Sequence, residues 1–167
     1  TAFVGQLLDA SLKARMWHFP RNRTTKLKPE SSPVGSGSRI STYGTIVGLP
    51  WKATTRAKLS LLNHAPSKAT LMGHGMNAHS MTQSKLDEGY LDNAIFTSST
   101  SRVPIQEGLA EGNIAKLAAS IRSSFQAVSP QATSKIVERT EGLHNPRFVT
   151  IAINAFLGMD FVVAGWQ

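Results

Sequence analysis

Histidine and serine are the residue types in this chain that could carry catalysis. The five histidines are His18, His64, His74, His79 and His144. His74 and His79 lie five residues apart in a glycine-rich stretch, whereas the zinc-binding helix motif needs histidines four apart with a glutamate between them. No Gly-x-Ser-x-Gly pattern surrounds a candidate nucleophile. We therefore expect exposed or partner-facing histidines and neither a catalytic site nor a metal site.

The sequence also lacks the residues that other kinds of catalytic and cofactor-binding sites require. The chain has no cysteine, which excludes disulfides, cysteine-ligated zinc, iron–sulfur clusters, a thiol nucleophile and a thioether-linked chromophore. Gly35-Ser36-Gly37 lacks the Gly-Lys-Ser/Thr end of a phosphate-binding loop. The ten carboxylates are scattered. We expect a protein that is not an enzyme and binds no cofactor covalently.

Charge is distributed unevenly along the chain, whose formal net charge is +8 over 167 residues. Residues 1–70 hold eleven basic and two acidic residues, a net charge of +9, and residues 71–167 hold seven and eight, a net charge of −1. Such asymmetry is typical of a basic arm on a neutral folded part. It indicates a partner with an acidic surface: nucleic acid, anionic membrane or acidic protein.

The first hundred residues give weak secondary-structure signals. Helical spacing occurs over residues 5–18, before Pro20. Residues 29–44 are rich in serine, glycine and proline and should form loop or extended chain. Residues 46–51 could form a short extended segment that ends at Pro50. Residues 63–106 are polar and broken, and 71–103 are assigned as an irregular connector.

The last 64 residues carry clear helix signals. Pro104 can open a short helix. An amphipathic helix should follow, because its apolar positions share one face: Ile114, Leu117, Ala118, Ile121, Phe125 and Val128. Ser129-Pro130 should start a helix from about Pro130 to Glu141 that ends at Gly142, and Asn145-Pro146 a third, buried helix from Pro146 to about Leu157 with Gly158 as its stop.

These signals predict a mainly α protein: a small helical C-terminal unit with a long irregular basic N-terminal arm. The arm, residues 1–70, would be extended with one short helix, the connector would span 71–103, and the helical unit 104–167. Residues 148–166 are long enough to span a membrane, but Asn154, Gly158 and Asp160 interrupt them, and an aspartate at mid-bilayer costs about 2.5–3.5 kcal/mol. We expect no membrane span and no signal peptide.

The C-terminal third resembles the phycobilisome linker domain. The resemblance is carried by His144-Asn145-Pro146-Arg147-Phe148-Val149-Thr150-Ile151 and by Leu157-Gly158-Met159-Asp160. Upstream, Gln106, Leu109, Gly112, Asn113 and Ile114 resemble the family's helix–turn pattern, and Leu117, Ile121, Ser124 and Phe125 its next helix. Met159 replaces a usual arginine and Pro146 a usual tyrosine or polar residue. The resemblance covers none of the first hundred residues.

The resemblance implies a colourless linker or scaffold that joins acidic phycobiliprotein discs, with other linkers, in a light-harvesting phycobilisome. Such a protein of photosynthesis lies at the stromal or cytoplasmic face of the thylakoid membrane, in a chloroplast or a cyanobacterium. Its basic arm would enter the discs, where complementary charge fixes orientation. Its aromatic residues would pack beside the bilins of partner subunits.

We expect partner binding in the arm and structural roles in the helical unit. The predicted partner-binding residues are Arg15, Trp17, Phe19, Arg21, Arg23, Lys26, Lys28, Arg39, Tyr43, Trp51, Lys52, Arg56 and Lys58. The predicted structural residues are Asn145, Arg147, Phe148, Leu157, Gly158 and Asp160. Two alternatives stay open: a basic RNA-associated protein such as an organellar ribosomal subunit, and a single-span subunit of a photosynthetic or respiratory membrane complex.

Overall fold

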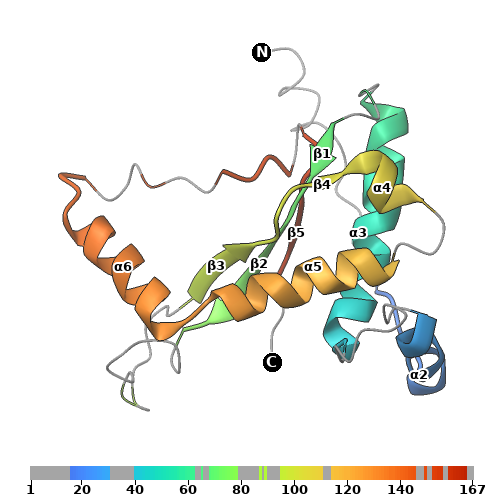
Figure 1. The fold of residues 1–167 in the computed structure, drawn as a ribbon, viewed down its shortest axis with the longest axis horizontal. Helices are drawn as coiled ribbons and strands as arrows, with labels where there is room; N and C mark the ends of the chain where they lie inside the picture. The colour runs from blue at the N-terminus through green and yellow to red at the C-terminus, as the bar shows by residue number, and fades with distance from the viewer. Residues whose placement is uncertain are drawn as a thin grey trace.

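The computed structural model describes residues 16–30, 40–62, 65, 68–78, 87, 89, 95–110, 114–145, 149, 152–155 and 158–164. Its helices are α2 (Arg21–Glu30), α3 (Thr42–Leu61), α4 (Ile105–Leu109), α5 (Ile114–Ala127) and α6 (Pro130–Glu141). Its strands are β1 (Ala69–Thr70), β2 (Met72–Asn77), β3 (Ile95–Ser99), β4 (Val103–Pro104) and β5 (Phe161–Val163). Figure 1 shows their arrangement.

The prediction of a mainly α fold is wrong, because strands form two sheets beside the helices. β1 pairs antiparallel with β4, and a second sheet has the order β3-β2-β5, with β3 antiparallel and β5 parallel to β2. β2, β3 and the start of β4 therefore form within the described part of 71–103, a range that was expected to be irregular. The central strand β2 is buried on both faces, so it lacks the polar–apolar alternation that marks a half-exposed strand.

The N-terminal region also contains more helix than predicted. α3 covers residues 42–61, including the segment expected to be extended up to Pro50. The Ser41 hydroxyl accepts a hydrogen bond from the Gly44 amide at 3.0 Å and so starts the helix. Pro50 removes one backbone hydrogen bond inside the helix. Burial of Val47 and Trp51 on its inner face offsets this cost.

The helix predictions between residues 104 and 142 are confirmed. α4 begins directly after Pro104, and α5 buries Leu117, Ala118 and Ile121 from the predicted apolar stripe. α6 has the predicted bounds, Pro130 to Glu141, because the Ser129 hydroxyl accepts from the Ala132 amide at 3.2 Å. Local capping signals were sufficient here, since they act within one turn of the chain.

The third predicted helix, Pro146 to Leu157, is not formed by its described residues. Val149 and residues 152–154 are not helical, and Val149 is exposed rather than buried. The carbonyl groups of Ala155 and Gly158 accept hydrogen bonds from Lys58 instead of from a following helical turn. The predicted helix at 5–18 lies outside the described residues apart from 16–18, which are not helical.

A single apolar core contains residues from the predicted arm, the predicted connector and the predicted helical unit. Its buried members come from α3, β2, β4 and α5: Val47, Trp51, Met72, Val103, Leu117 and Ile121. α5 lies across one face of the three-stranded sheet (Figure 1). On the opposite face of that sheet, Ile95 and Val162 are exposed. The described part of 1–70 thus contains two helices, α2 and α3, and strand β1, and α3 contributes to the core, so this part is not an extended arm.

None of the helices in the described ranges combines the length and apolar character needed to cross a bilayer.

Trp51 should be the most sensitive core position. Its side chain is fully buried and donates a hydrogen bond from Nε1 to the Thr70 hydroxyl at 3.0 Å. We expect Trp51→Ala to lower the free energy of unfolding by about 3–5 kcal/mol. Trp51→Phe keeps a ring in place and should cost clearly less. Urea unfolding followed by circular dichroism measures both, and an alanine variant of native stability would contradict this role.

Candidate functional site

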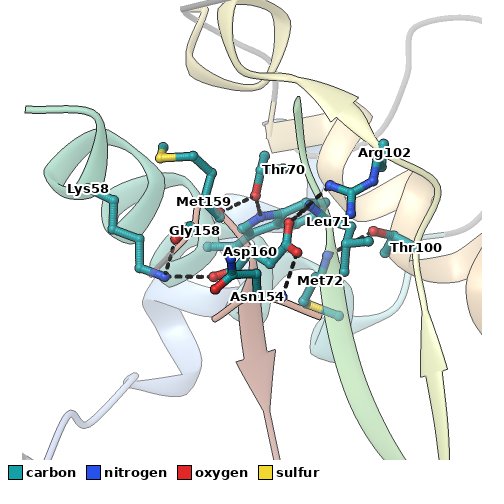
Figure 2. A network of polar contacts seen from close by, with 11 residues as sticks. Lys58, Thr70, Leu71, Met72, Thr100, Arg102, Asn154, Gly158, Met159 and Asp160 are labelled. Atoms are coloured by element: carbon teal, nitrogen blue, oxygen red, sulfur yellow. Dashed lines mark hydrogen bonds and ion pairs between the residues drawn. The ribbon is translucent and has the colours of Figure 1, made fainter. Parts of the chain in front are cut away.

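The densest polar network surrounds the buried carboxylate of Asp160, directly before β5. Asp160 Oδ1 accepts hydrogen bonds from the Leu71 amide at 3.2 Å and from Arg102 at 3.4 Å, and Oδ2 accepts from the Asn154 amide at 2.9 Å. Figure 2 shows these groups converging on the carboxylate. Backbone donors on two separate segments therefore meet at this one carboxylate.

Lys58 reaches the same region from the C-terminal half of α3. Its Nζ donates to the carbonyl oxygens of Ala155, of Gly158 at 3.1 Å and of Asp160 at 2.7 Å. Burial lowers the pKa of Lys58, and the nearby charge of Asp160 acts in the opposite direction. The ammonium group holds the turn that precedes β5, since it carries three donors for three carbonyl oxygens.

Two threonines link this network to the sheets (Figure 2). The Thr70 hydroxyl, which accepts from Trp51, donates to the Met159 carbonyl at 2.6 Å. The Thr100 hydroxyl accepts from the Met72 amide at 3.0 Å. Gly158 is required in the turn, because a Cβ there would lie 2.8 Å from the Asn154 carbonyl oxygen. The donors and acceptors satisfy one another, so the arrangement positions β5.

His74 and Ser124 form the described pair that most resembles a base and a nucleophile. His74 Nε2 lies 2.8 Å from Ser124 Oγ, and Ser124 donates its proton to the Ile121 carbonyl at 2.7 Å. The ring N–H of His74 must therefore be at Nε2, donating to the serine. Both residues are buried, and the serine proton already has an acceptor. The pair is a structural contact between β2 and α5.

Burial makes His74 a neutral residue, which corrects the expectation of an exposed or partner-facing histidine. Its ring lies against Phe125 with centroids 4.2 Å apart, and burial lowers its pKa. Nδ1 is buried with no hydrogen-bond partner among the described residues. No group of three or more histidine or carboxylate side chains in the described ranges could hold a metal ion.

The predicted partner-binding residues fall into two groups. Trp51 is fully buried in the core, which corrects its assignment as a surface anchor. Lys58 is used by the Asp160 network, and Lys52 donates to the Ala110 carbonyl at 2.7 Å. Tyr43 is half-buried and packs edge-on against Phe125 at 5.5 Å, and burial raises its pKa.

The other group lies on the surface. Trp17, Arg21, Arg23, Lys26 and Arg56 are exposed, while Phe19 and Lys28 are half-buried. Arg15 and Arg39, and the predicted structural residues Arg147, Phe148 and Leu157, lie outside the described residues. Asn145 is half-buried, and Gly158 and Asp160 belong to the network before β5.

Sequence reasoning missed the partners of Asp160. Lys58, Leu71 and Arg102 belong to three separate segments, and no local spacing joins them. The resemblance had singled out Asp160, but not the contacts that it makes. For Lys58, the sequence offered its positive charge as the signal, and this charge led to the prediction that it binds a partner at the surface.

Comparison with known proteins gives a fold relationship and no family. No protein-family model matches this chain, and no curated protein matches its sequence. The fold is similar to the crystal structure of TRI101 from F. sporotrichioides, solved in complex with coenzyme A and T-2. The TM-score is 0.71 over 89% of this chain, with 16% sequence identity, and the match covers 34% of the TRI101 chain. The shared feature is the fold alone.

The Asp160 carboxylate should contribute far more to the free energy of unfolding than its ion pair with Arg102 does. Asp160→Asn places an amide group where the Asn154 and Leu71 amides need acceptors, and we expect a loss of about 3 kcal/mol in the free energy of unfolding. Arg102→Ala is the matched control, because the arginine side chain is 56% exposed and should cost at most about 1 kcal/mol. Urea unfolding measures the free energy of unfolding of both variants. Equal losses in Asp160→Asn and Arg102→Ala would contradict the expectation that the carboxylate contributes more than the ion pair.

Stability should decrease as the pH falls from 7 to 5, because His74 is held neutral. The pKa of His74 is lowered in the folded state from its ordinary value of 6.5, so the unfolded chain takes up the proton first. The loss begins near the unfolded value and continues down through the folded one, with a slope of at most about 1.4 kcal/mol per pH unit. In His74→Gln, which does not titrate, the slope over this range should flatten. An unchanged slope would rule out His74 as its source.

Proposed function

We propose that this chain forms part of an acyltransferase that uses coenzyme A, and that it contributes to binding of the coenzyme A thioester. The fold similarity to TRI101, an acyltransferase whose structure contains coenzyme A, carries the proposal. The chain spans about a third of the TRI101 length (34%). The complete active site would therefore include residues that this chain does not supply.

The charge of the chain supports a coenzyme A ligand. Coenzyme A is a polyanion because of its phosphate groups, and the chain has a net charge of +8. A positive surface raises the local concentration of such a ligand and its rate of association. The acidic partner expected from the charge distribution can thus be a small anionic cofactor as well as an acidic macromolecule.

Acyl transfer from coenzyme A makes one bond and breaks one. The acceptor nucleophile forms a bond to the thioester carbonyl carbon, the carbon–sulfur bond breaks, and the acceptor's proton reaches the thiolate, so that free coenzyme A leaves as a thiol. A general base must take that proton first. Among the described residues, His74 Nε2 lies 2.8 Å from Ser124 Oγ in the buried interior, and this contact alone does not assign the base. Binding and positioning are the roles that the described residues support.

This proposal departs from the expectation that the protein is not an enzyme. The phycobilisome linker function stays a prediction, as do the thylakoid location and the RNA-associated alternative. The helix predicted at 146–157 from Asn145-Pro146, within the stretch that carries the linker resemblance, is not formed by its described residues. The excess of basic residues does not distinguish the acyltransferase, the linker and the RNA-associated protein from one another. Each of these would bind a negatively charged partner: coenzyme A, a phycobiliprotein disc or RNA.

Direct binding of acetyl-coenzyme A tests the proposal. Titration calorimetry with the chain should give saturable binding that weakens as salt is added, since ion pairs with phosphates are screened. At a ligand concentration of about 100 times the Kd, the free energy of unfolding should rise by about 2.7 kcal/mol. Inorganic pyrophosphate at the same concentration is the control and should stabilise the chain much less.

Binding to another ligand in place of acetyl-coenzyme A would overturn the acyltransferase proposal. If acetyl-coenzyme A does not bind at millimolar concentration while purified phycobiliprotein discs or RNA bind at micromolar concentration, the acyltransferase proposal is wrong. Such a result would favour the linker or the RNA-associated alternative according to which ligand binds.

A further inference from the structure

Helix α5 contacts two different neighbours along its length. Its first half packs against α3, where a Cβ placed on Gly48 would lie 3.7 Å from Ile114 Cγ2 and 3.9 Å from Leu117 Cβ. Leu117 and Ile121 belong to the buried core. The last turn of α5, residues 124–127, lies over the three-stranded sheet, at the end from which the chain continues to α6 (Figure 1). The two ends of α5 are therefore held by different contacts.

His74 on the central strand β2 holds the last turn of α5. His74 Nε2 lies 2.8 Å from Ser124 Oγ, and the histidine ring packs against Phe125 with centroids 4.2 Å apart. On the neighbouring strand β3, Ser98 donates from its hydroxyl to the Ser124 carbonyl at 3.2 Å. His74 is fully buried, so solvent does not reach its ring while the end of α5 stays in place.

The elements around His74 carry no second group that titrates near neutral pH. β3 and β5, on either side of β2, contain no titratable side chain. On α5, Lys116 is exposed and Arg122 is half-buried. On α3, Tyr43 packs against Phe125, and burial raises its pKa. The other charged groups on α3 and next to β5 are bonded to other segments or exposed: Lys52, Lys58, Asp160 and Arg56. His74 is therefore the group at this contact whose charge changes between about pH 5 and pH 7.

A second proton on His74 would create a buried charge without a partner. In the neutral ring the N–H is at Nε2, and Nδ1 is buried with no hydrogen-bond partner within the described ranges. The added proton must therefore go to Nδ1, where the new N–H finds no acceptor. Such a charge is stable only if it reaches water. Release of the last turn of α5 gives it that access with a small loss of contact, because the first half of the helix stays packed on α3.

We propose that the contact between His74 and Ser124 is an acid-sensitive switch that releases the last turn of α5. In acid His74 takes up a proton, residues 124–127 separate from β2, and α6, which begins at Pro130, moves with them. Burial lowers the pKa of His74 in the closed form, so the open form binds the proton first and acid favours opening. At neutral pH the uncharged ring restores the contact. This inference does not depend on the proposed function.

Amide hydrogen exchange of the full chain at about pH 7 and pH 5 tests the switch, with each rate corrected for the pH dependence of exchange in an unfolded peptide. The protection of residues 124–127 should fall by about 10- to 25-fold. The upper limit follows because a histidine with the ordinary pKa of 6.5 in the open form gains its proton over this range. The protection of residues 117–121, in the half of α5 that α3 holds, should change less than about twofold.

Two histidine variants and one direct measurement identify the group responsible. His74→Gln removes the titration but keeps a side-chain amide that can donate to Ser124, so protection of residues 124–127 should no longer depend on pH. His18→Gln is the matched control, because His18 is exposed, and it should keep the full response. In the unchanged protein, nuclear magnetic resonance of the His74 ring nitrogens should show protonation over the same pH range in which residues 124–127 lose protection, and this measurement needs no variant to fold.

Three results would overturn the switch. An equal loss of protection in α3 and in both halves of α5 would show that acid promotes global unfolding and not a local opening. A full acid response in His74→Gln, or a His74 ring that stays neutral while residues 124–127 lose protection, would assign the effect to another group. Unchanged protection of residues 124–127 at pH 5 would show that the contact does not open.

Discussion

The structure depends on one buried carboxylate, Asp160, whose oxygens must find hydrogen-bond donors inside the fold. A buried polar group is tolerated only when hydrogen-bond partners surround it. Here the donors are the amides of Leu71 and Asn154 and the side chain of Arg102. Because Lys58 binds the carbonyl groups of the same turn, the carboxylate and the ammonium hold α3, the sheet and the last described segment in one arrangement.

The polar network around Asp160 and the apolar core both hold α3 against the sheet. Trp51 illustrates the connection, since its ring lies in the core while its indole N–H reaches Thr70, which in turn binds the Met159 carbonyl. Apolar burial supplies the larger part of the free energy but has no direction. The hydrogen bonds select the register in which β5 lies beside β2.

The sequence predicted elements whose signals are local and missed those that depend on distant partners. α5 and α6 were predicted with nearly correct bounds because an apolar stripe, Ser129 and Pro130 act within a few residues. α3 was missed, since Pro50 and nearby glycines outweigh the helical pattern until the burial of Trp51 is known. β2 was missed because both its faces are covered. At the site, Asp160 was predicted as a structural residue of a helical unit and Lys58 as a partner-binding residue, because nothing near Lys58 in the chain indicates its acceptors.

The long sequence separation between Lys58 and the Asp160 carbonyl, 102 residues, has a consequence for biosynthesis. During translation α3, β2 and α5 emerge well before the segment that completes their sheet. Until β5 has left the ribosome, one edge of β2 is unpaired and Lys58 has no carbonyl groups to bind. Folds with such distant contacts form slowly, and their unpaired strand edges can associate with other chains.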